Sequence, residues 1–248
     1  MFKKKFLKAE QGFTVIEALF AILIATIFIT VAMQMMAIAA IFKARAQQNA
    51  EATAWIQEDL ENVKLQATEL YIKNVDRMSA STSEITIASH GYSNGDTIIF
   101  QGTGTIAEGI EQSKTYYVRD VATNTFKLAN SSGGTAIALT RDSSGDIMSI
   151  ATVKCAVDPD TDTDGFGDSL RDLINDDSAS TNNPSKTFSK TSTLTLQQFN
   201  LARSTIPNSD DYKSLKIGYT VTPASGGKSI ASFYTEVIPN AALYCPTN

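Results

Sequence analysis

The sequence has 248 residues, of which 43% are hydrophobic and 19% are charged, and its formal net charge is −5. These averages exclude a disordered, collagen-like or disulfide-dense chain, and they argue against a nucleic-acid binder that works through overall basic charge. One histidine and two cysteines leave little material for a metal site built on those residues. The averages hide a local bias, because apolar and acidic residues are each concentrated in short segments.

Residues 13–42 form an apolar stretch that is long enough to cross a membrane as a helix. Of its 30 residues, 25 are apolar, and none is proline or glycine. Its helical length is about 45 Å, against about 30 Å for the hydrocarbon core of a bilayer. A cleaved secretory signal would be about half as long, so we expect the helix to be retained. The lysines of residues 1–12 favour a cytoplasmic N-terminus.

Glu17 is the charged exception in this stretch, and a carboxylate near a membrane helix is costly. Its position near the helix start would also let it reach the membrane interface. The run Gly12-Phe13-Thr14-Val15-Ile16-Glu17 follows a short basic leader and precedes the apolar helix. This arrangement resembles the prepilin signature of type IV pilins and of the pseudopilins of type II secretion systems. The resemblance covers about the first 45 residues.

The resemblance implies a role for each residue of the signature. A prepilin peptidase would cut between Gly12 and Phe13, removing a leader of residues 1–12, and would methylate the new amine of Phe13. Glu17 would pair with the N-terminal amine of a neighbouring subunit, because each buried charge relieves the desolvation of the other. Residues 13–42 would pack into the core of a filament after leaving the membrane.

The implied protein is a structural subunit, a minor pilin, and not an enzyme. It would be a single-pass protein of the inner membrane as a prepilin and would then belong to an extracellular pilus at the cell surface. The implied partners are other pilin subunits, the prepilin peptidase, the inner-membrane assembly platform and membrane lipid, with no nucleic acid predicted for this chain directly. Adhesion, motility and DNA uptake are possible downstream roles.

Two other functions stay open at this point. A pseudopilin of a type II secretion system carries the same N-terminal signature. A membrane-anchored surface binding protein or enzyme would use the helix as an anchor alone. The second alternative predicts that the chain tolerates Glu17→Ala and keeps residues 1–12.

The helical pattern continues beyond the apolar stretch, and we expect one helix over residues 13–78. Apolar residues spaced by three and four positions define one stripe on its second half. They are Ile56, Leu60, Val63, Ala67 and Leu70. Pilin heads place such a stripe on an antiparallel sheet, so the expected fold class is α+β. We expect Trp55 to be a packing residue.

Residues 84–145 change character and predict a small β module inserted into the head. Alternating residues predict strands from Glu84 and at 97–100, 115–119 and 125–129, with a turn at Asn94-Gly95-Asp96. The segment resembles β modules that recur in phage structural and bacterial surface proteins. His90 is expected in a structural turn, because no nucleophile motif accompanies it. Tyr116, Tyr117 and Phe126 are expected to pack the module rather than to line a sugar-binding surface.

Residues 146–248 form the C-terminal part of the predicted head. Alternation predicts strands at 191–196, 215–222 and 230–237, and the last two flank a hairpin loop at 223–228. Cys155 and Cys245 are the only cysteines. An exported head would favour a disulfide between them, and pilin heads often tie their C-terminal region in this way. The alternative is two separate buried thiols.

The aspartate run after Cys155 resembles the Asp-x-Asp-x-Asp-Gly calcium loop of EF-hand-like and dockerin-like sites. Asp160, Asp162 and Asp164 would supply carboxylates, Phe166 a carbonyl oxygen, and Asp168 the ligand at position nine. Position twelve, normally an acid, is Arg171, so Asp172 would have to supply the outgoing ligand. Ca²⁺ is the expected ion because Mg²⁺ demands a tighter octahedral geometry. A solvated acidic loop is the alternative.

Overall fold

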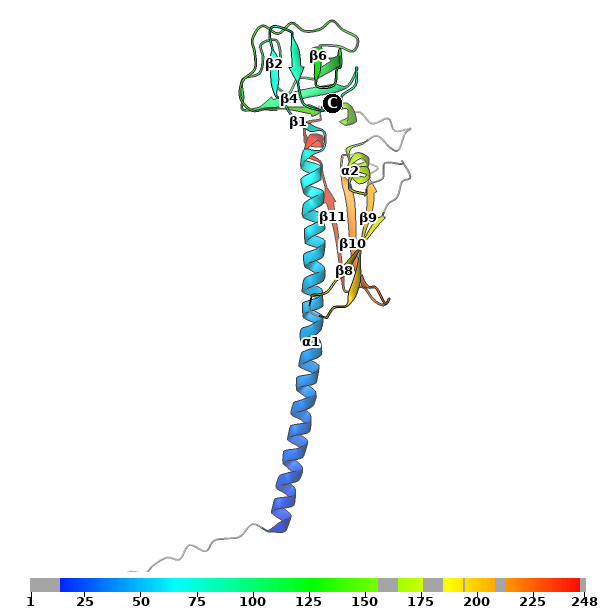
Figure 1. The fold of residues 1–248 in the computed structure, drawn as a ribbon. Coiled ribbons are helices and arrows are strands. Elements are labelled where there is room, and N and C mark those ends of the chain that lie inside the picture. Colours follow the sequence, from blue (N-terminus) through cyan, green and yellow to red (C-terminus); the bar gives the residue numbers. More distant parts are fainter. Residues whose placement is uncertain (1–13, 156–164, 176–184, 194, 208–212, 246–248) are drawn as a thin grey trace, which may run out of the picture. The chain divides into compact units, whose positions relative to one another are not determined.

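The computed structural model describes residues 14–155, 165–175, 185–193, 195–207 and 213–245. The chain forms two compact units, residues 1–50 and residues 51–248. The first contains the beginning of a long helix, α1, and the second contains the remainder of α1 and all the strands (Figure 1). The fold class is α+β, as the sequence predicts.

Helix α1 spans Val15–Glu69, a run of 55 residues without proline or glycine. It ends well before the predicted residue 78. Tyr71 takes a positive φ of 60°, which breaks the helix, and strand β1 (Ile72–Asn74) begins directly after it. The Tyr71 ring packs edge-on against Phe166, with ring centroids 5.7 Å apart. The turn therefore comes where an aromatic side chain enters the core.

The second half of α1 packs on a sheet through the predicted apolar stripe. Ile56, Leu60, Val63 and Ala67 are buried, together with Ala52 one turn earlier. Leu70 and Trp55 are partly buried against the same cluster, and Trp55 contacts Phe199 with centroids 5.7 Å apart. The prediction of one buried face is confirmed. Burial of each of the larger side chains, Ile56, Leu60 and Val63, contributes about 1.5–3 kcal/mol.

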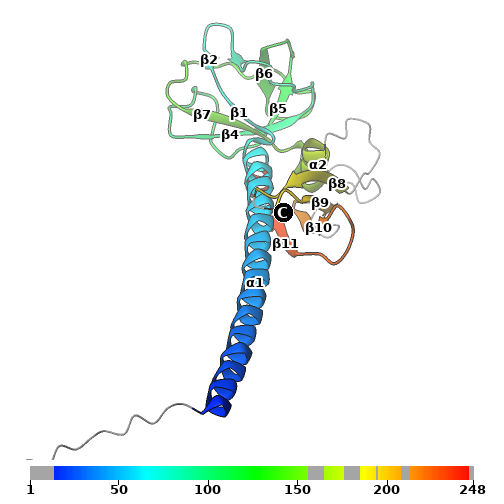
Figure 2. The same cartoon turned by 60° about the horizontal axis from the view of Figure 1, so that its bottom comes forward.

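The sheet that covers this stripe has four antiparallel strands in the order β11-β10-β9-β8 (Figure 2). The strands are β8 (Ser185–Thr191), β9 (Gln198–Pro207), β10 (Leu215–Pro223) and β11 (Ala231–Val237). Leu215, Ile217, Tyr219 and Val221 alternate on the buried face of β10. The predicted hairpin is confirmed, with Leu215 opposite Val237 and glycines of positive φ in its loop.

The predicted strand at 191–196 is wrong, because this segment is the connection between β8 and β9. Thr191 pairs with Gln198 at the end of the ladder. Between them the Ser192 N–H bonds to the Gln197 carbonyl, and Leu196 takes a positive φ of 56°. Leu196 is also 79% exposed. Alternation of polar and apolar residues here reflects a tight turn and not a half-buried strand.

A second sheet has seven strands in the order β1-β7-β4-β5-β6-β3-β2. Besides β1 they are β2 (Arg77–Ser79), β3 (Glu84–Thr86), β4 (Thr97–Gly102), β5 (Tyr116–Arg119), β6 (Thr125–Ala129) and β7 (Ile147–Ala151). The predicted strands correspond to β3, β4, β5 and β6. Strands β1, β2 and β7 lie outside residues 84–145, so the sheet is larger than the expected module.

A short helix and two 3-10 turns join the two sheets. They are α2 (Phe166–Asn175), η1 (Val153–Cys155) and η2 (Asn240–Tyr244). Phe166, Ala241 and Ala242 form a buried cluster with Ile99 and Ile150 of the seven-stranded sheet. A side chain at Gly167 would collide with the Ser214 carbonyl oxygen, so glycine permits α2 to approach the sheet closely.

Candidate functional site

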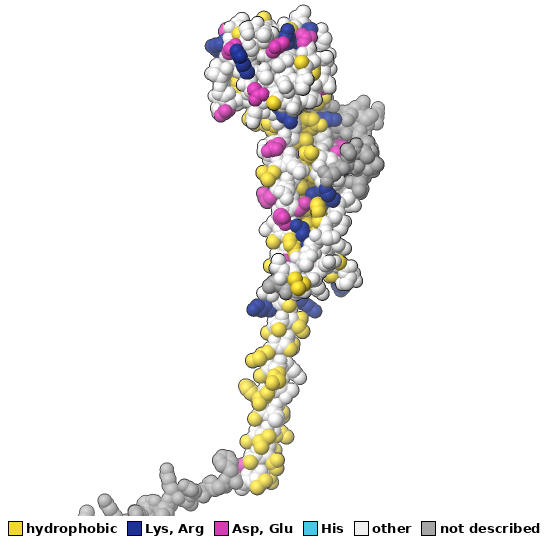
Figure 3. All heavy atoms as spheres, in the orientation of Figure 1, with side chains coloured by type: hydrophobic (Ala, Val, Ile, Leu, Met, Phe, Trp, Pro, Cys, Tyr) yellow, Lys and Arg dark blue, Asp and Glu magenta, His cyan; other side chains and the backbone are white. Residues whose placement is uncertain are grey.

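The first half of α1 exposes apolar side chains on every side. Large hydrophobic residues are more than half exposed at successive positions, including Ile22, Leu23 and Ile24, so they do not form a single stripe. Figure 3 shows these side chains along the first half of the helix. A helix that is apolar all round must be covered by lipid or by other helices. In the described part of the chain, α1 is the one helix long and apolar enough to cross a membrane.

The start of α1 is closed by a reciprocal pair of hydrogen bonds between Thr14 and Glu17. The Thr14 N–H donates to Glu17 Oε2 at 3.2 Å, and the Glu17 N–H donates to Thr14 Oγ1 at 3.4 Å. The Thr14 hydroxyl also donates to Glu17 Oε2, at 3.1 Å. This is a capping box, which satisfies backbone donors that a helix start leaves unpaired. Gly12 and Phe13 lie outside the described residues.

Two threonines inside the apolar half place little polar surface in its surroundings. Thr26 Oγ1 donates to the Leu23 carbonyl at 2.8 Å, and Thr30 Oγ1 donates to the Thr26 carbonyl at 2.7 Å. Hydroxyls bonded to their own helix in this way are tolerated in hydrocarbon, because their donors are satisfied. These two threonines therefore suit an apolar environment, and Gln34 is the one exposed amide on the same half.

A buried ion pair joins the second half of α1 to the four-stranded sheet. Arg203 of β9 is 3% exposed, and its Nη1 donates to both carboxylate oxygens of Asp59, at 3.0 and 2.8 Å. Tyr219 of β10 donates its hydroxyl to Asp59 Oδ2 at 2.8 Å. Burial, followed by the hydrogen bond to Asp59, raises the pKa of Tyr219 above its usual value. The hydroxyl thus remains a donor at neutral pH.

Further contacts hold Arg203 in place. Its Nη2 donates to the Ile174 carbonyl at 2.6 Å and to Asn175 Oδ1 at 3.1 Å, which brings in the end of α2. The guanidinium also lies 5.4 Å from the centroid of the Phe188 ring. One arginine therefore connects α1, α2 and β8. The prediction from the sequence missed it, although Asp59 lies within the apolar stripe and Arg203 shares the buried face of β9 with Leu201.

The described part of the candidate calcium loop contains an internal ion pair. Asp168 of α2 is 1% exposed, and its Oδ1 lies 2.9 Å from Arg171 Nη1. Asp172 Oδ1 lies 3.0 Å from Arg171 Nη2. Phe166 is buried at the start of α2. Asp160, Asp162 and Asp164 lie outside the described residues. Arg171 therefore supplies the positive charge beside the two carboxylates that the structure places.

No metal centre is found among the residues that the structure describes. No group of three His, Cys, Asp or Glu side chains comes close enough there to hold an ion. Asp168 and Asp172 do not fit a cation site as they stand, because each is already paired with Arg171.

The two cysteines form a disulfide, Cys155–Cys245, with their Cα atoms 5.4 Å apart. Both lie against the small core cluster that contains Phe166 and Ala242. The bridge ties η1, which follows the seven-stranded sheet, to the residue after η2 near the C-terminus. The predicted pairing is confirmed, and the alternative of two separate buried thiols is wrong.

Tyr116 and Phe126 pack the core of the seven-stranded sheet as predicted, whereas Tyr117 is only partly buried and lies outside the core cluster. Tyr116 and Phe126 are fully buried, and His90 is 5% exposed. The Tyr92 N–H donates to His90 Nδ1 at 2.9 Å, and His90 Nε2 lies 2.9 Å from the Ala122 carbonyl. His90 therefore holds a turn through both ring nitrogens, as expected. Neither its position nor its partners offer a nucleophile–base arrangement.

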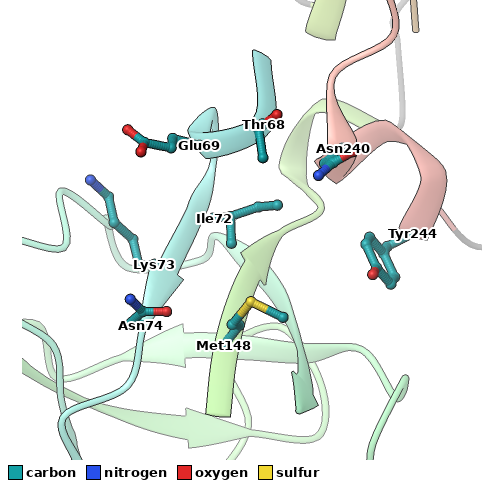
Figure 4. A pocket seen from close by; sticks show the side chains of 8 residues that line it. All are labelled: Thr68, Glu69, Ile72, Lys73, Asn74, Met148, Asn240 and Tyr244. Carbon is teal, nitrogen blue, oxygen red and sulfur yellow. The ribbon is translucent and has the colours of Figure 1, made fainter. Parts of the chain in front are cut away.

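An open pocket of about 410 Å³ lies where α1 ends, between β1, β7 and η2. Its lining residues are Thr68, Glu69, Ile72, Lys73, Asn74, Met148, Asn240 and Tyr244. Figure 4 shows Glu69 and Lys73 on one side and Met148 and Tyr244 on the other. The charged side chains do not converge on a common centre, so the pocket has no arrangement for acid–base or metal chemistry.

Comparison of the chain with models of known protein families, with curated proteins and with solved structures found no match.

Proposed function

We propose that the chain is a structural subunit, a minor pilin, of a type IV pilus-like filament. The observation that carries this proposal is the division of α1 into two chemically different halves. Residues 15–42 are apolar on all sides and begin with the Glu17 capping box, whereas residues 51–69 bury one stripe on an antiparallel sheet. The first half suits a membrane and a filament core in turn, and the second half carries the folded head.

During the proposed assembly, the apolar half of α1 moves from a surrounding of lipid to a surrounding of other helices. Lipid covers residues 15–42 of the single-pass prepilin in the inner membrane, and helices of neighbouring pilin subunits cover them in the extracellular filament. A prepilin peptidase frees and methylates the Phe13 amine, and an inner-membrane platform extracts the subunit. Glu17 then turns from Thr14 to the amine of a neighbour, which selects subunit register because two buried charges relieve each other.

We predict that the protein from its native membrane has lost residues 1–12 and carries one methyl group. Intact-mass spectrometry measures both changes at once. An unprocessed start at Met1 would overturn the proposal in favour of a membrane-anchored binding protein.

Glu17→Ala should reduce filament assembly at least tenfold while the subunit stays in the membrane, whereas Glu69→Ala, at the exposed end of α1, should leave assembly unchanged. A pseudopilin would be identified by a different result: the leader is removed, cells that carry Glu17→Ala fail to secrete proteins, and no pili are seen on the surface of cells that carry the natural chain.

We also propose that the loop of residues 158–168 binds Ca²⁺ through Asp160, Asp162 and Asp164. The support is the alternation of carboxylates before Gly165 in the sequence. Asp168 and Asp172 are left out of the ligand set because each is paired with Arg171. With only part of the usual ligand set free, the site would be weak. Extracellular calcium near the millimolar range suits such a site. The ion would neutralise part of the negative charge of the acidic segment and would hold the chain that leads into α2.

Calcium is expected to raise the melting temperature of the full chain in detergent. At about 100 times its Kd, a ligand of the folded state contributes about 2.7 kcal/mol, which corresponds to about 5–10 °C for a chain of this size. Differential scanning calorimetry with calcium, with magnesium and with a chelator measures the shift. Asp162→Asn should abolish it, and Asp120→Asn, an exposed control directly after β5, should leave it unchanged. Equal melting temperatures with calcium and with chelator would remove the proposal.

A further inference from the structure

Two basic residues end the apolar half of α1. Lys43 and Arg45 are both exposed, and they are the first charged residues after Glu17. The next charged residue is Glu51, so no carboxylate lies one helical turn away on either side to neutralise them. Carboxylates of their own helix therefore do not pair these two exposed cations, which are free to bind negative groups outside the chain.

The two cations lie on opposite sides of the helix. Residues two positions apart on an α-helix are separated by roughly 200° around its axis. Figure 3 shows Lys and Arg side chains on both sides of the helix where its apolar stretch ends. A folded partner protein could bind both charges only if they lay on a single face of the helix, and they do not. A layer of negative groups that surrounds the helix meets charges on every face, and this is the geometry of a lipid surface.

The spacing along α1 matches the thickness of a bilayer with its headgroups. Glu17 and Lys43 are 26 residues apart (43 − 17), which is about 39 Å of helix. The hydrocarbon core is about 30 Å thick, and the bilayer with its headgroup layers is about 40–45 Å. When Glu17 lies in one headgroup layer, Lys43 and Arg45 therefore reach the other. The apolar stretch is longer than the hydrocarbon core is thick, so the apolar residues at its two ends lie at the borders between the core and the headgroup layers.

We propose that Lys43 and Arg45 form a collar that binds the phosphates of phospholipid headgroups and sets the depth of α1 in the membrane. Arginine can hold a phosphate through two parallel hydrogen bonds, and lysine binds it as a point charge. The flexible stems of both side chains let the charges reach the headgroup layer from a helix that continues through it. The collar rests on the ability of α1 to span a membrane, and not on filament assembly.

The collar is tested by mapping which residues of α1 are accessible from outside the membrane. The full chain is reconstituted in vesicles of phosphatidylcholine and phosphatidylglycerol, with one cysteine introduced at Ala37, Ala40, Ala44 or Ala46. A membrane-impermeant maleimide labels accessible positions, and labelling is normalised to a cysteine at the exposed Ser225. We expect labelling to begin between Ala40 and Ala46.

Removing both charges should let the helix sink, because Lys43→Leu with Arg45→Leu lengthens the apolar stretch. Labelling at position 46 should then fall at least fivefold. The exchange variant Lys43→Arg with Arg45→Lys should keep the original boundary, and so should Lys64→Leu, which removes a lysine far from the collar. An unmoved boundary in the leucine variant, or an equal shift in the exchange variant, would overturn the proposal. Leader processing is independent of either result, so failure of the collar and failure of the pilin proposal are distinguishable.

Discussion

Arg203→Ala should lower the free energy of unfolding by about 3–5 kcal/mol, because it leaves the Asp59 carboxylate, whose side chain is only 14% exposed, without its cation. The substitution also leaves the Ile174 carbonyl without its donor and removes the contact with Phe188. Urea denaturation of the full chain in detergent measures the change. Trp55 is the single tryptophan and packs on Phe199 at the same helix–sheet contact, so its fluorescence reports on this contact directly.

The chain offers a matched control for this substitution. Lys190 of β8 pairs with Glu58 of α1 at 2.9 Å, but the Glu58 side chain is 62% exposed. This pair also joins α1 to the four-stranded sheet, and Lys190→Ala should change the free energy of unfolding by only about 0.5 kcal/mol. A similar loss in both variants would show that the Asp59–Arg203 pair is no stronger than a surface ion pair. Replacing Asp59 and Arg203 together by leucine and methionine should recover most of the loss, since no unpaired charge remains.

Loss of the Cys155–Cys245 disulfide should lower the free energy of unfolding by about 2–5 kcal/mol. The two residues are 90 positions apart, so the bridge restricts a long loop in the unfolded chain. In the folded chain it holds η2 and its buried Ala241 and Ala242 against β7 and α2. The corresponding fall in melting temperature is on the order of 10 °C for a chain of this length.

Calorimetry of the oxidised chain, the reduced chain and the Cys155→Ser, Cys245→Ser double variant tests this prediction. Reduction should lower the melting temperature of the natural chain close to that of the double variant. The reductant should have no effect on the double variant itself, which controls for its action elsewhere. If the reduced and oxidised chains melt together, the bridge contributes nothing to the stability of the head.

Local periodicity predicted the elements whose burial follows a simple repeat. The stripe from Ile56 to Ala67 follows the helical period, and β10 alternates regularly from Leu215 to Val221, so each pattern fixed its own buried face. Helix α2 was missed because Gly165 and Gly167 flank Phe166 and disfavour a helix in isolation. Its helical form depends on Leu170 and Ile174, which pack on the sheet and the stripe of α1.

The buried contacts of the candidate sites were harder to predict, because they join residues far apart in the chain. Asp59 and Arg203 are separated by 144 positions, and the sequence around either residue does not indicate its partner. Arg171 stands at the place where a calcium loop normally carries an acid, and this departure was visible in the sequence. Its pairing with the buried Asp168 was not visible, because burial of that carboxylate depends on tertiary packing. The capping bonds of Glu17 follow a known local spacing, Thr-x-x-Glu.

The pairing of β1 with β7 has a consequence for how this protein can change over evolutionary time. These strands are the first and last of the seven-stranded sheet, and they lie side by side, with Ile72 opposite Ile150. The Ala151 N–H bonds to the Tyr71 carbonyl at 2.9 Å, so the chain leaves the sheet beside the point where it arrives. The segment between β1 and β7 therefore starts and ends at neighbouring points of the fold. Its loops can lengthen, shorten or be replaced while β1 and β7 keep their positions next to each other.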